Sequence, residues 1–200
     1  MAMHMPMLRD GEEEAIHALA AAVEARDPYT QAHTKRVAES ARRIGRAMNL
    51  CAEDQDALYR GGLVHDVGKI GVPDDILLKP GALDHQERVK MDLHPLIGES
   101  IVARLRSGIE LRAMVRNHHE HYDGTGYPDR LARDEIPLLA RILSVCDAYD
   151  ALVNDRPYRE RVSPDEAVRI LLEGAGRQWD PEVVHFVVVD ARNGKREVTA

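Results

Sequence analysis

Aromatic residues are scarce in this chain of 200 residues, which contains six tyrosines, one tryptophan and one phenylalanine. Aliphatic side chains and alanine must therefore fill most of the hydrophobic core. Hydrophobic residues still make up 44% of the sequence. Because a chain of this length can bury a sizeable core, we expect one domain of ordinary size.

Cysteine is also rare. Cys51 and Cys146 are the two cysteines of the sequence, and they form no CxxC pattern. A structural zinc site built from several cysteines is thereby excluded, and a disulfide scaffold is not supported. We therefore expect a reduced, cytoplasmic protein.

Long apolar runs and long basic runs are both missing. No run approaches the ~20 apolar residues that a transmembrane helix needs, so we expect no membrane span. The net charge is −7, and the pI is about 5.8. A sequence without a basic run is a poor candidate for binding DNA or an acidic membrane surface.

Apolar residues recur at helical spacing along most of the chain, and no stretch shows the sustained alternation of a β-strand. We predict helices at about residues 12–26, 28–49, 53–66, 163–174 and 181–188, with others following Asp84 and Pro137. Pro95 predicts a break or kink near residues 93–95. The expected fold is an all-α, single-domain helical bundle at residues 12–200, with residues 1–11 as a leader or linker.

The stretch from Gly61 to Gly71 combines an apolar run with an adjacent histidine and aspartate, His65 and Asp66, and then Lys69. The two ligand types do not share a helix face, but they can converge on one ion at a helix end. A carboxylate has two oxygens and can bridge two cations. Taken alone, such a pair more often marks a plain helix end, with a hydrogen-bonded histidine and a solvated aspartate.

Five of the ten histidines and two aspartates lie at predicted helix ends or on apolar stripes. Imidazole and carboxylate without thiolate suit iron, manganese or zinc in a site with open positions. Seven ligands are too many for one catalytic ion and suit two, with Asp66 bridging. Two ions ~3.5–4 Å apart are the arrangement used for phosphoester hydrolysis. The candidate ligands are His33, His65, Asp66, His94, His118, His119 and Asp147.

These residues belong to an ordered set of motifs that covers about residues 12–190. The motifs are Arg26–Thr30 with His33, Arg36 and Val37, then His65–Pro73, Leu78–Leu83 with Glu87, His94–Pro95, His118–Glu120, Asp123–Pro128, Ile136–Pro137, Asp147–Ala151 and Arg156–Arg159. The set resembles the HD-GYP domain, a subset of the HD metal-dependent phosphohydrolases. A histidine-aspartate pair alone is a weak signal, whereas this ordered set is highly specific.

The resemblance implies an HD-type helical bundle with a GYP loop, and a phosphodiesterase that cuts cyclic di-GMP to linear pGpG. Some members of the family continue to GMP. The resemblance also implies that the seven candidate ligands hold the metal ions, that Asp66 and Lys69 are catalytic, and that Lys69 meets a substrate phosphate. Tyr127, Arg156 and Arg159 match positions that contact the dinucleotide. Cyclic GMP-AMP and a nucleotide monoester stay open as alternative substrates.

Two other classes of function are alternatives to an enzyme. One is a cyclic-dinucleotide receptor that binds without turnover. The other is an interaction module whose Gly124–Arg130 loop docks a GGDEF-type diguanylate cyclase. Loss of a ligand would favour these alternatives, and none of the seven is lost. Docking is compatible with catalysis, and a homodimer is left open.

The number of metal ions depends on residue 29. Members of the family that hold three ions carry a glutamate four residues before the first histidine ligand. Here Tyr29 occupies that position. A neutral phenol, which ionises only near pH 10, is a poor ligand. We therefore expect two divalent ions, either iron or manganese, with zinc as the alternative.

Arg156 and Arg159 generate a prediction about substrate binding. Each guanidinium can pair with a phosphate through two hydrogen bonds. Replacing either residue by alanine should raise KM for cyclic di-GMP, measured by steady-state kinetics, and should leave the metal content unchanged. If neither substitution weakens substrate binding, this segment does not contact the dinucleotide.

Overall fold

A computed structural model of the chain describes residues 5–26, 31–155 and 160–198, with side chains described for residues 11–26, 32–155 and 160–193. The described residues form helices and no named strand, which confirms the expected all-α class. The helices are α1 (Met5–Arg26), α2 (Gln31–Ala47), α3 (Ala52–Val64), α4 (Asp74–Leu77), α5 (His85–Met91), α6 (His94–Val102), α7 (Gly108–Asn117), α8 (Leu138–Val153), α9 (Pro164–Gly174) and α10 (Pro181–Val198), with 3-10 turns η1 (Val67–Gly71) and η2 (Arg133–Glu135).

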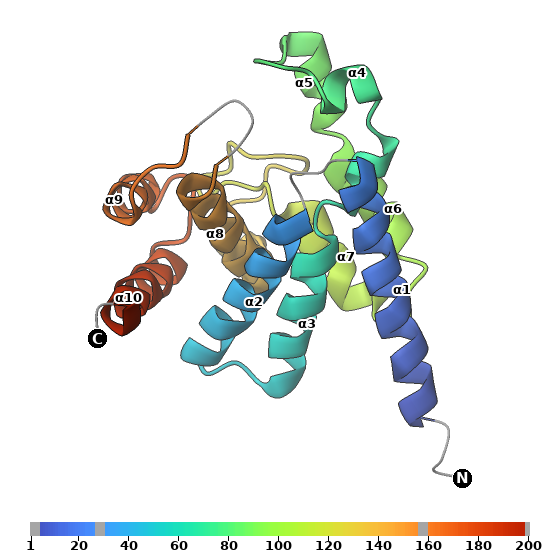
Figure 1. Cartoon of the computed structure of the whole chain (residues 1–200), viewed down its shortest axis with the longest axis horizontal. Helices are drawn as coiled ribbons and strands as arrows, with labels where there is room; N and C mark the ends of the chain where they lie inside the picture. The colour runs from blue at the N-terminus through green and yellow to red at the C-terminus, as the bar shows by residue number, and fades with distance from the viewer. Residues whose placement is uncertain (1–4, 27–30, 156–159, 199–200) are drawn as a thin grey trace.

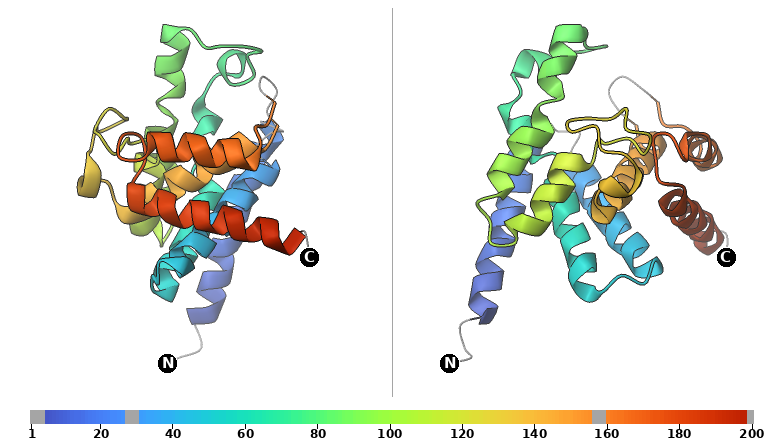
Figure 2. Two further views of the ribbon diagram at one scale, coloured as in Figure 1. Left: turned by 90° about the vertical axis from the view of Figure 1, so that its left-hand side faces the viewer. Right: turned by 180° about the vertical axis from the view of Figure 1, so that it is seen from behind.

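The helices pack around an antiparallel pair, α2 and α3, which make the most extensive contact in the fold. Helix α8 lies against α2, and α9 and α10 pack in turn on α8 (Figures 1 and 2). Helix α1 runs along α3 and reaches η1, while α6 packs on α7 and η1. Helices α4 and α5 project from the rest of the molecule in every view.

The core is aliphatic, as the composition predicts. Fully buried side chains come from α1, α2, α3, α6, α7, α8, α9 and α10, and Trp179 is the one aromatic residue of this buried cluster among the described residues. Among the largest are Ile44, Leu58, Leu111, Met114, Ile142, Leu143 and Leu171. This core fixes the ends of α3 and α7, where several candidate ligands are found.

Several helix boundaries differ from the predicted ones. Helix α1 begins at Met5, upstream of the expected start at residue 12; the division into a leader and a domain stays a prediction. The break predicted near residues 93–95 is confirmed: Pro95 lies in the first turn of α6, where its missing N–H needs no partner, so it marks a helix start. One helical turn, α4, lies between the helix predicted at residues 53–66 and the one predicted after Asp84, where no helix was expected.

Gly62 permits the close approach of α2 and α3. A Cβ atom there would lie 2.5 Å from the Ala38 Cα and 2.8 Å from the Ala38 nitrogen. Because both atoms are backbone, Gly62→Ala should cost about 1–3 kcal/mol of unfolding free energy, measured by urea denaturation. The matched control is Gly11→Ala in α1, where nothing lies within 4 Å of the added atom. That change should stabilise by up to about 1 kcal/mol, and equal effects at the two sites would contradict this account.

Candidate metal centre

Most of the candidate ligands lie at the ends of helices and turns, and the fold brings these ends close together. His65 directly follows α3, Asp66 directly precedes η1, and His94 begins α6. His118 and His119 directly follow α7, while His33 and Asp147 lie within α2 and α8. Five of the seven are buried, and His119 and Asp147 are half-buried.

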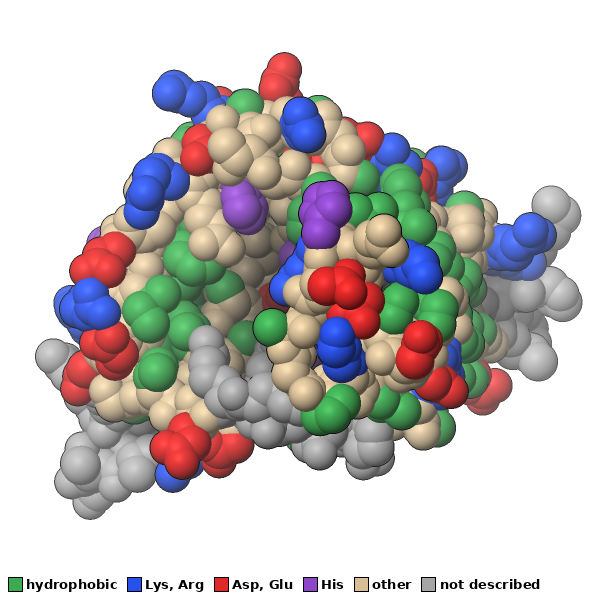
Figure 3. Space-filling view, turned by 90° about the horizontal axis from the view of Figure 1, so that it is seen from above, with side chains coloured by type: hydrophobic (Ala, Val, Ile, Leu, Met, Phe, Trp, Pro, Cys, Tyr) green, Lys and Arg blue, Asp and Glu red, His purple; other side chains and the backbone are tan. Residues whose placement is uncertain are grey.

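Close packing of η1 on α6 brings Asp66 to His94. A Cβ atom at Gly68 would lie 1.8 Å from the carbonyl oxygen of His94, so only glycine fits there. Seen from above, the surface is hollowed near its middle, with histidine and hydrophobic side chains beside the hollow (Figure 3).

Three buried histidines are held by the same hydrogen bond. In each, Nδ1 lies 2.8 Å from the backbone carbonyl oxygen three residues earlier, which can only accept. The proton of the neutral ring is therefore on Nδ1, and Nε2 carries a free lone pair. The pairs are His65 with Gly62, His94 with Met91, and His118 with Val115.

The three Nε2 atoms are buried and have no hydrogen-bond partner among the described residues. Two of them face the carboxylate of Asp66: the His65 Nε2 is 3.4 Å from Oδ2, and the His94 Nε2 is 3.4 Å from Oδ1. Burying hydrogen-bond acceptors opposite one another costs free energy unless positive charge lies between them. The donor set therefore fits metal ions, for which neutral imidazole and carboxylate are ordinary ligands.

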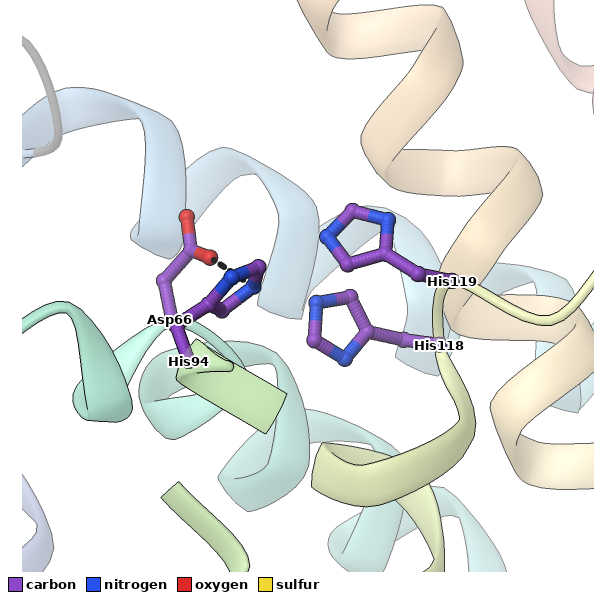
Figure 4. Close-up of side chains that lie close together, drawn as sticks. All are labelled: Asp66, His94, His118 and His119. Carbon is purple, nitrogen blue, oxygen red and sulfur yellow. Dashed lines mark ion pairs between the residues drawn. The ribbon is translucent and has the colours of Figure 1, made fainter. Parts of the chain in front are cut away.

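Two groups of mutually close ligand atoms share Asp66. One group contains Asp66, His94, His118 and His119, and the other contains His33, His65 and Asp66. Within each group the atoms lie within 4.8 Å of one another. Figure 4 shows the rings of His118 and His119 opposite Asp66 and His94. Asp66 is thus placed to contact two ions. Asp147 belongs to neither group and adjoins the second, with its Oδ1 3.1 Å from the His33 Nε2.

The charges of the cluster suit metal binding. Burial lowers the pKa of His94 and holds that of His118 well below its ordinary value. Burial also lowers the pKa of His119 to about 3, so these imidazoles are neutral at physiological pH. Burial opposes the charge of Asp66, but the nearby ammonium group of Lys69 holds the pKa of this carboxyl well below its ordinary value. The Lys69 Nζ donates to Asp66 Oδ2 over 2.6 Å.

Asp150 has a role that the sequence analysis did not assign. Its Oδ2 accepts from the His33 Nδ1 at 2.7 Å, and Arg36 donates to the same carboxylate at 2.6 and 2.9 Å. Burial opposes protonation of His33, but hydrogen bonds to Asp147 and Asp150 outweigh it and raise its pKa to about 9. A carboxylate that binds the other nitrogen of a ligand imidazole fixes the orientation of the ring. The spacing of Asp147 and Asp150, three residues apart on α8, was the available signal.

Tyr127 covers one side of the cluster. Its ring stacks on His119, with centroids 5.0 Å apart and planes 21° apart, and its backbone N–H donates to the His119 carbonyl at 3.2 Å. Burial raises the pKa of Tyr127, so its hydroxyl keeps its proton. The other residues expected at the substrate or beside the ions, Tyr29, Arg156 and Arg159, lie outside the described residues.

Asp150→Ala tests the orienting role of this carboxylate. Loss of a carboxylate behind a ligand imidazole typically weakens metal binding about 10–100-fold, and we expect a loss in that range by metal titration. The matched control is Asp190→Ala, because Asp190 pairs with Arg43 on the same helix α2, away from the cluster. The control should bind metal as the wild type does. An unchanged affinity in folded Asp150→Ala protein would contradict the assignment.

Comparison with known proteins places this chain in a family. Residues 17–183 match the HD domain. The chain is 38% identical over 182 residues to the cyclic di-GMP phosphodiesterase response regulator RpfG of Xanthomonas campestris pv. campestris, covering 90% of this chain and 48% of RpfG. It is 36% identical over 183 residues to the 3'3'-cGAMP-specific phosphodiesterase 2 of Vibrio cholerae, covering 90% of this chain and 35% of that protein.

A solved structure shares the fold. The crystal structure described as a cyclic GMP-AMP specific phosphodiesterase of V. cholerae (V-cGAP3) matches with a TM-score of 0.67 and 20% identity, covering 91% of this chain and 49% of that one. The chain spans about half or less of the length of the curated relatives RpfG and phosphodiesterase 2. The match to residues 17–183 and the shared fold lead to one conclusion: the chain belongs to the HD-domain family.

Proposed function

We propose that this chain is a metal-dependent phosphodiesterase that hydrolyses cyclic di-GMP to linear pGpG. The observation that carries the proposal is the set of three buried Nε2 atoms near Asp66 that have no hydrogen-bond partner among the described residues. The name of the relative RpfG supports the substrate. Membership of the HD-domain family supports the reaction class.

The proposed centre holds two divalent ions, with Asp66 as the shared ligand. Iron or manganese suits this mixture of imidazole and carboxylate, and zinc is the alternative. When bound, such ions supply positive charge that polarises a phosphodiester and makes water more acidic. The proposed ligands are His33, His65, Asp66, His94, His118, His119 and Asp147.

Among the described residues, Lys69 forms an ion pair with the shared carboxylate. Its ammonium group lies 2.6 Å from Asp66 Oδ2, and its side chain is 20% exposed. A phosphate that enters beside Asp66 can therefore accept a hydrogen bond from Lys69. A fixed donor aimed at phosphoryl oxygens stabilises the charge that grows on them during hydrolysis. Arg156 and Arg159 stay predictions for the binding of the dinucleotide.

Cyclic GMP-AMP is a second candidate substrate. The specific observation in its favour is the 36% identity to a relative that is named 3'3'-cGAMP-specific. The ratio of kcat/KM for cyclic di-GMP and 3'3'-cGAMP, measured on one preparation, decides between the two. The further step to GMP, a GGDEF-type partner at the Gly124–Arg130 loop and a homodimer also stay predictions. No helix in the described part of the chain is long and apolar enough to cross a membrane.

Asp66→Ala tests the proposed centre. Asp66 belongs to both groups of ligand atoms. Its loss should therefore remove most bound metal and lower the turnover of cyclic di-GMP by at least about a hundredfold. Metal analysis and product chromatography measure the two effects. Asp75→Ala, an exposed aspartate in α4, is the control and should match the wild type. Near-normal turnover by folded Asp66→Ala protein would refute the proposal.

A further inference from the structure

The loop between α7 and α8 is anchored to the end of α7. Residues 123–131 of this loop contain Tyr127. Glu120, which directly follows His118 and His119, is 2% exposed. Its Oε1 accepts from the backbone N–H of Asp129 at 2.6 Å, and its Oε2 accepts from that of Leu131 at 3.1 Å. A buried carboxylate is thus satisfied by the loop backbone itself.

An ion pair adds a second anchor at the same point. Arg116, in the last turn of α7, donates through Nε and Nη2 to the two carboxylate oxygens of Asp129 at 2.6 and 2.7 Å. Asn117, which is 5% exposed, donates to Asp129 Oδ2 at 3.1 Å. Arg116 is itself held from the other side by Glu99 of α6. Two parallel hydrogen bonds to a carboxylate fix geometry as well as charge.

These anchors determine where Tyr127 lies. Asp129 is two residues beyond Tyr127, and the Tyr127 N–H is bonded to the His119 carbonyl at 3.2 Å. The loop is therefore tied to α7 on both sides of the Tyr127–Pro128 step. The Tyr127 ring can then rest on His119 at a centroid distance of 5.0 Å.

We propose that Arg116, Asp129 and Glu120 are positioning residues that hold Tyr127 over His119 as one wall of the substrate site. This inference rests on the function proposed above. If an anchor is removed, the loop can detach from α7, and only a fraction of the molecules then holds Tyr127 against His119. The apparent affinity for substrate is the full affinity multiplied by that fraction. Once substrate is bound, the reacting groups are unchanged, so KM rises while kcat stays nearly constant.

Asp129→Ala tests this role directly. We expect KM for cyclic di-GMP to rise about fivefold, which corresponds to about 1 kcal/mol, while kcat changes by less than about twofold. Amide hydrogen exchange across residues 123–131 should become faster. The metal content and the unfolding midpoint should stay at their wild-type values. Asp129→Asn keeps the shape and one acceptor oxygen, so its KM should lie between those of wild type and Asp129→Ala.

The matched control is Arg112→Ala. Arg112 lies on α7 one turn before Arg116 and pairs with the same Glu99, at 2.8 Å, but among the described residues its side-chain hydrogen bonds run to Glu99 and not to the loop. Its removal should leave KM and loop exchange at wild-type values. An equal rise of KM in this control would show a general effect of lost charge on α7, and would overturn the positioning role.

The outcomes separate this inference from the proposed function. If wild type cleaves cyclic di-GMP and Asp129→Ala exchanges faster with unchanged KM, the loop is anchored but has no part in substrate binding. Unchanged loop exchange in Asp129→Ala overturns the anchoring itself, whatever the substrate. If metal-loaded wild type cleaves no cyclic dinucleotide, the proposed function fails together with the substrate role of Tyr127, and the exchange measurement still decides whether Asp129 holds the loop.

Discussion

A ring of buried imidazole acceptors around one carboxylate is the constraint on which this structure depends. The Nε2 atoms of His65, His94 and His118 are buried and have no hydrogen-bond partner in the described part of the chain, and two of them face oxygens of Asp66. Burying such acceptors costs free energy that a bound cation offsets, because each lone pair then becomes a ligand. Without a bound cation, these buried acceptors lower the stability of the fold. A bound cation would restore that stability.

The ends of helices make this ring possible. The last carbonyls of a helix have no partner within the helix. In α3, α5 and α7, such carbonyls belong to Gly62, Met91 and Val115, and each accepts the Nδ1 proton of a histidine just beyond. One local hydrogen bond thus satisfies a free carbonyl, sets the tautomer and aims Nε2 inward. The aliphatic core then needs only to bring the three helix ends together.

The sequence predicted the helices well because helices depend on local spacing, and the same spacing marked the candidate ligands, whose role in metal binding stays a prediction. His33 lies on the apolar stripe of α2, and the other candidate ligand histidines lie at helix ends. The roles of Asp150 and Glu120 were out of reach, since they depend on contacts between segments far apart in sequence. Asp150 meets His33 across α2 and α8, and Glu120 meets a loop that has no periodicity.

Anomalous X-ray diffraction from crystals of the metal-loaded protein is the most direct test of the central claim. The account predicts two metal peaks that share Asp66, one within bonding distance of the His65 Nε2 and the other bonded to the Nε2 atoms of His94 and His118. A metal-loaded crystal in which these nitrogens contact no ion would contradict it, and three peaks would overturn the expected metal count.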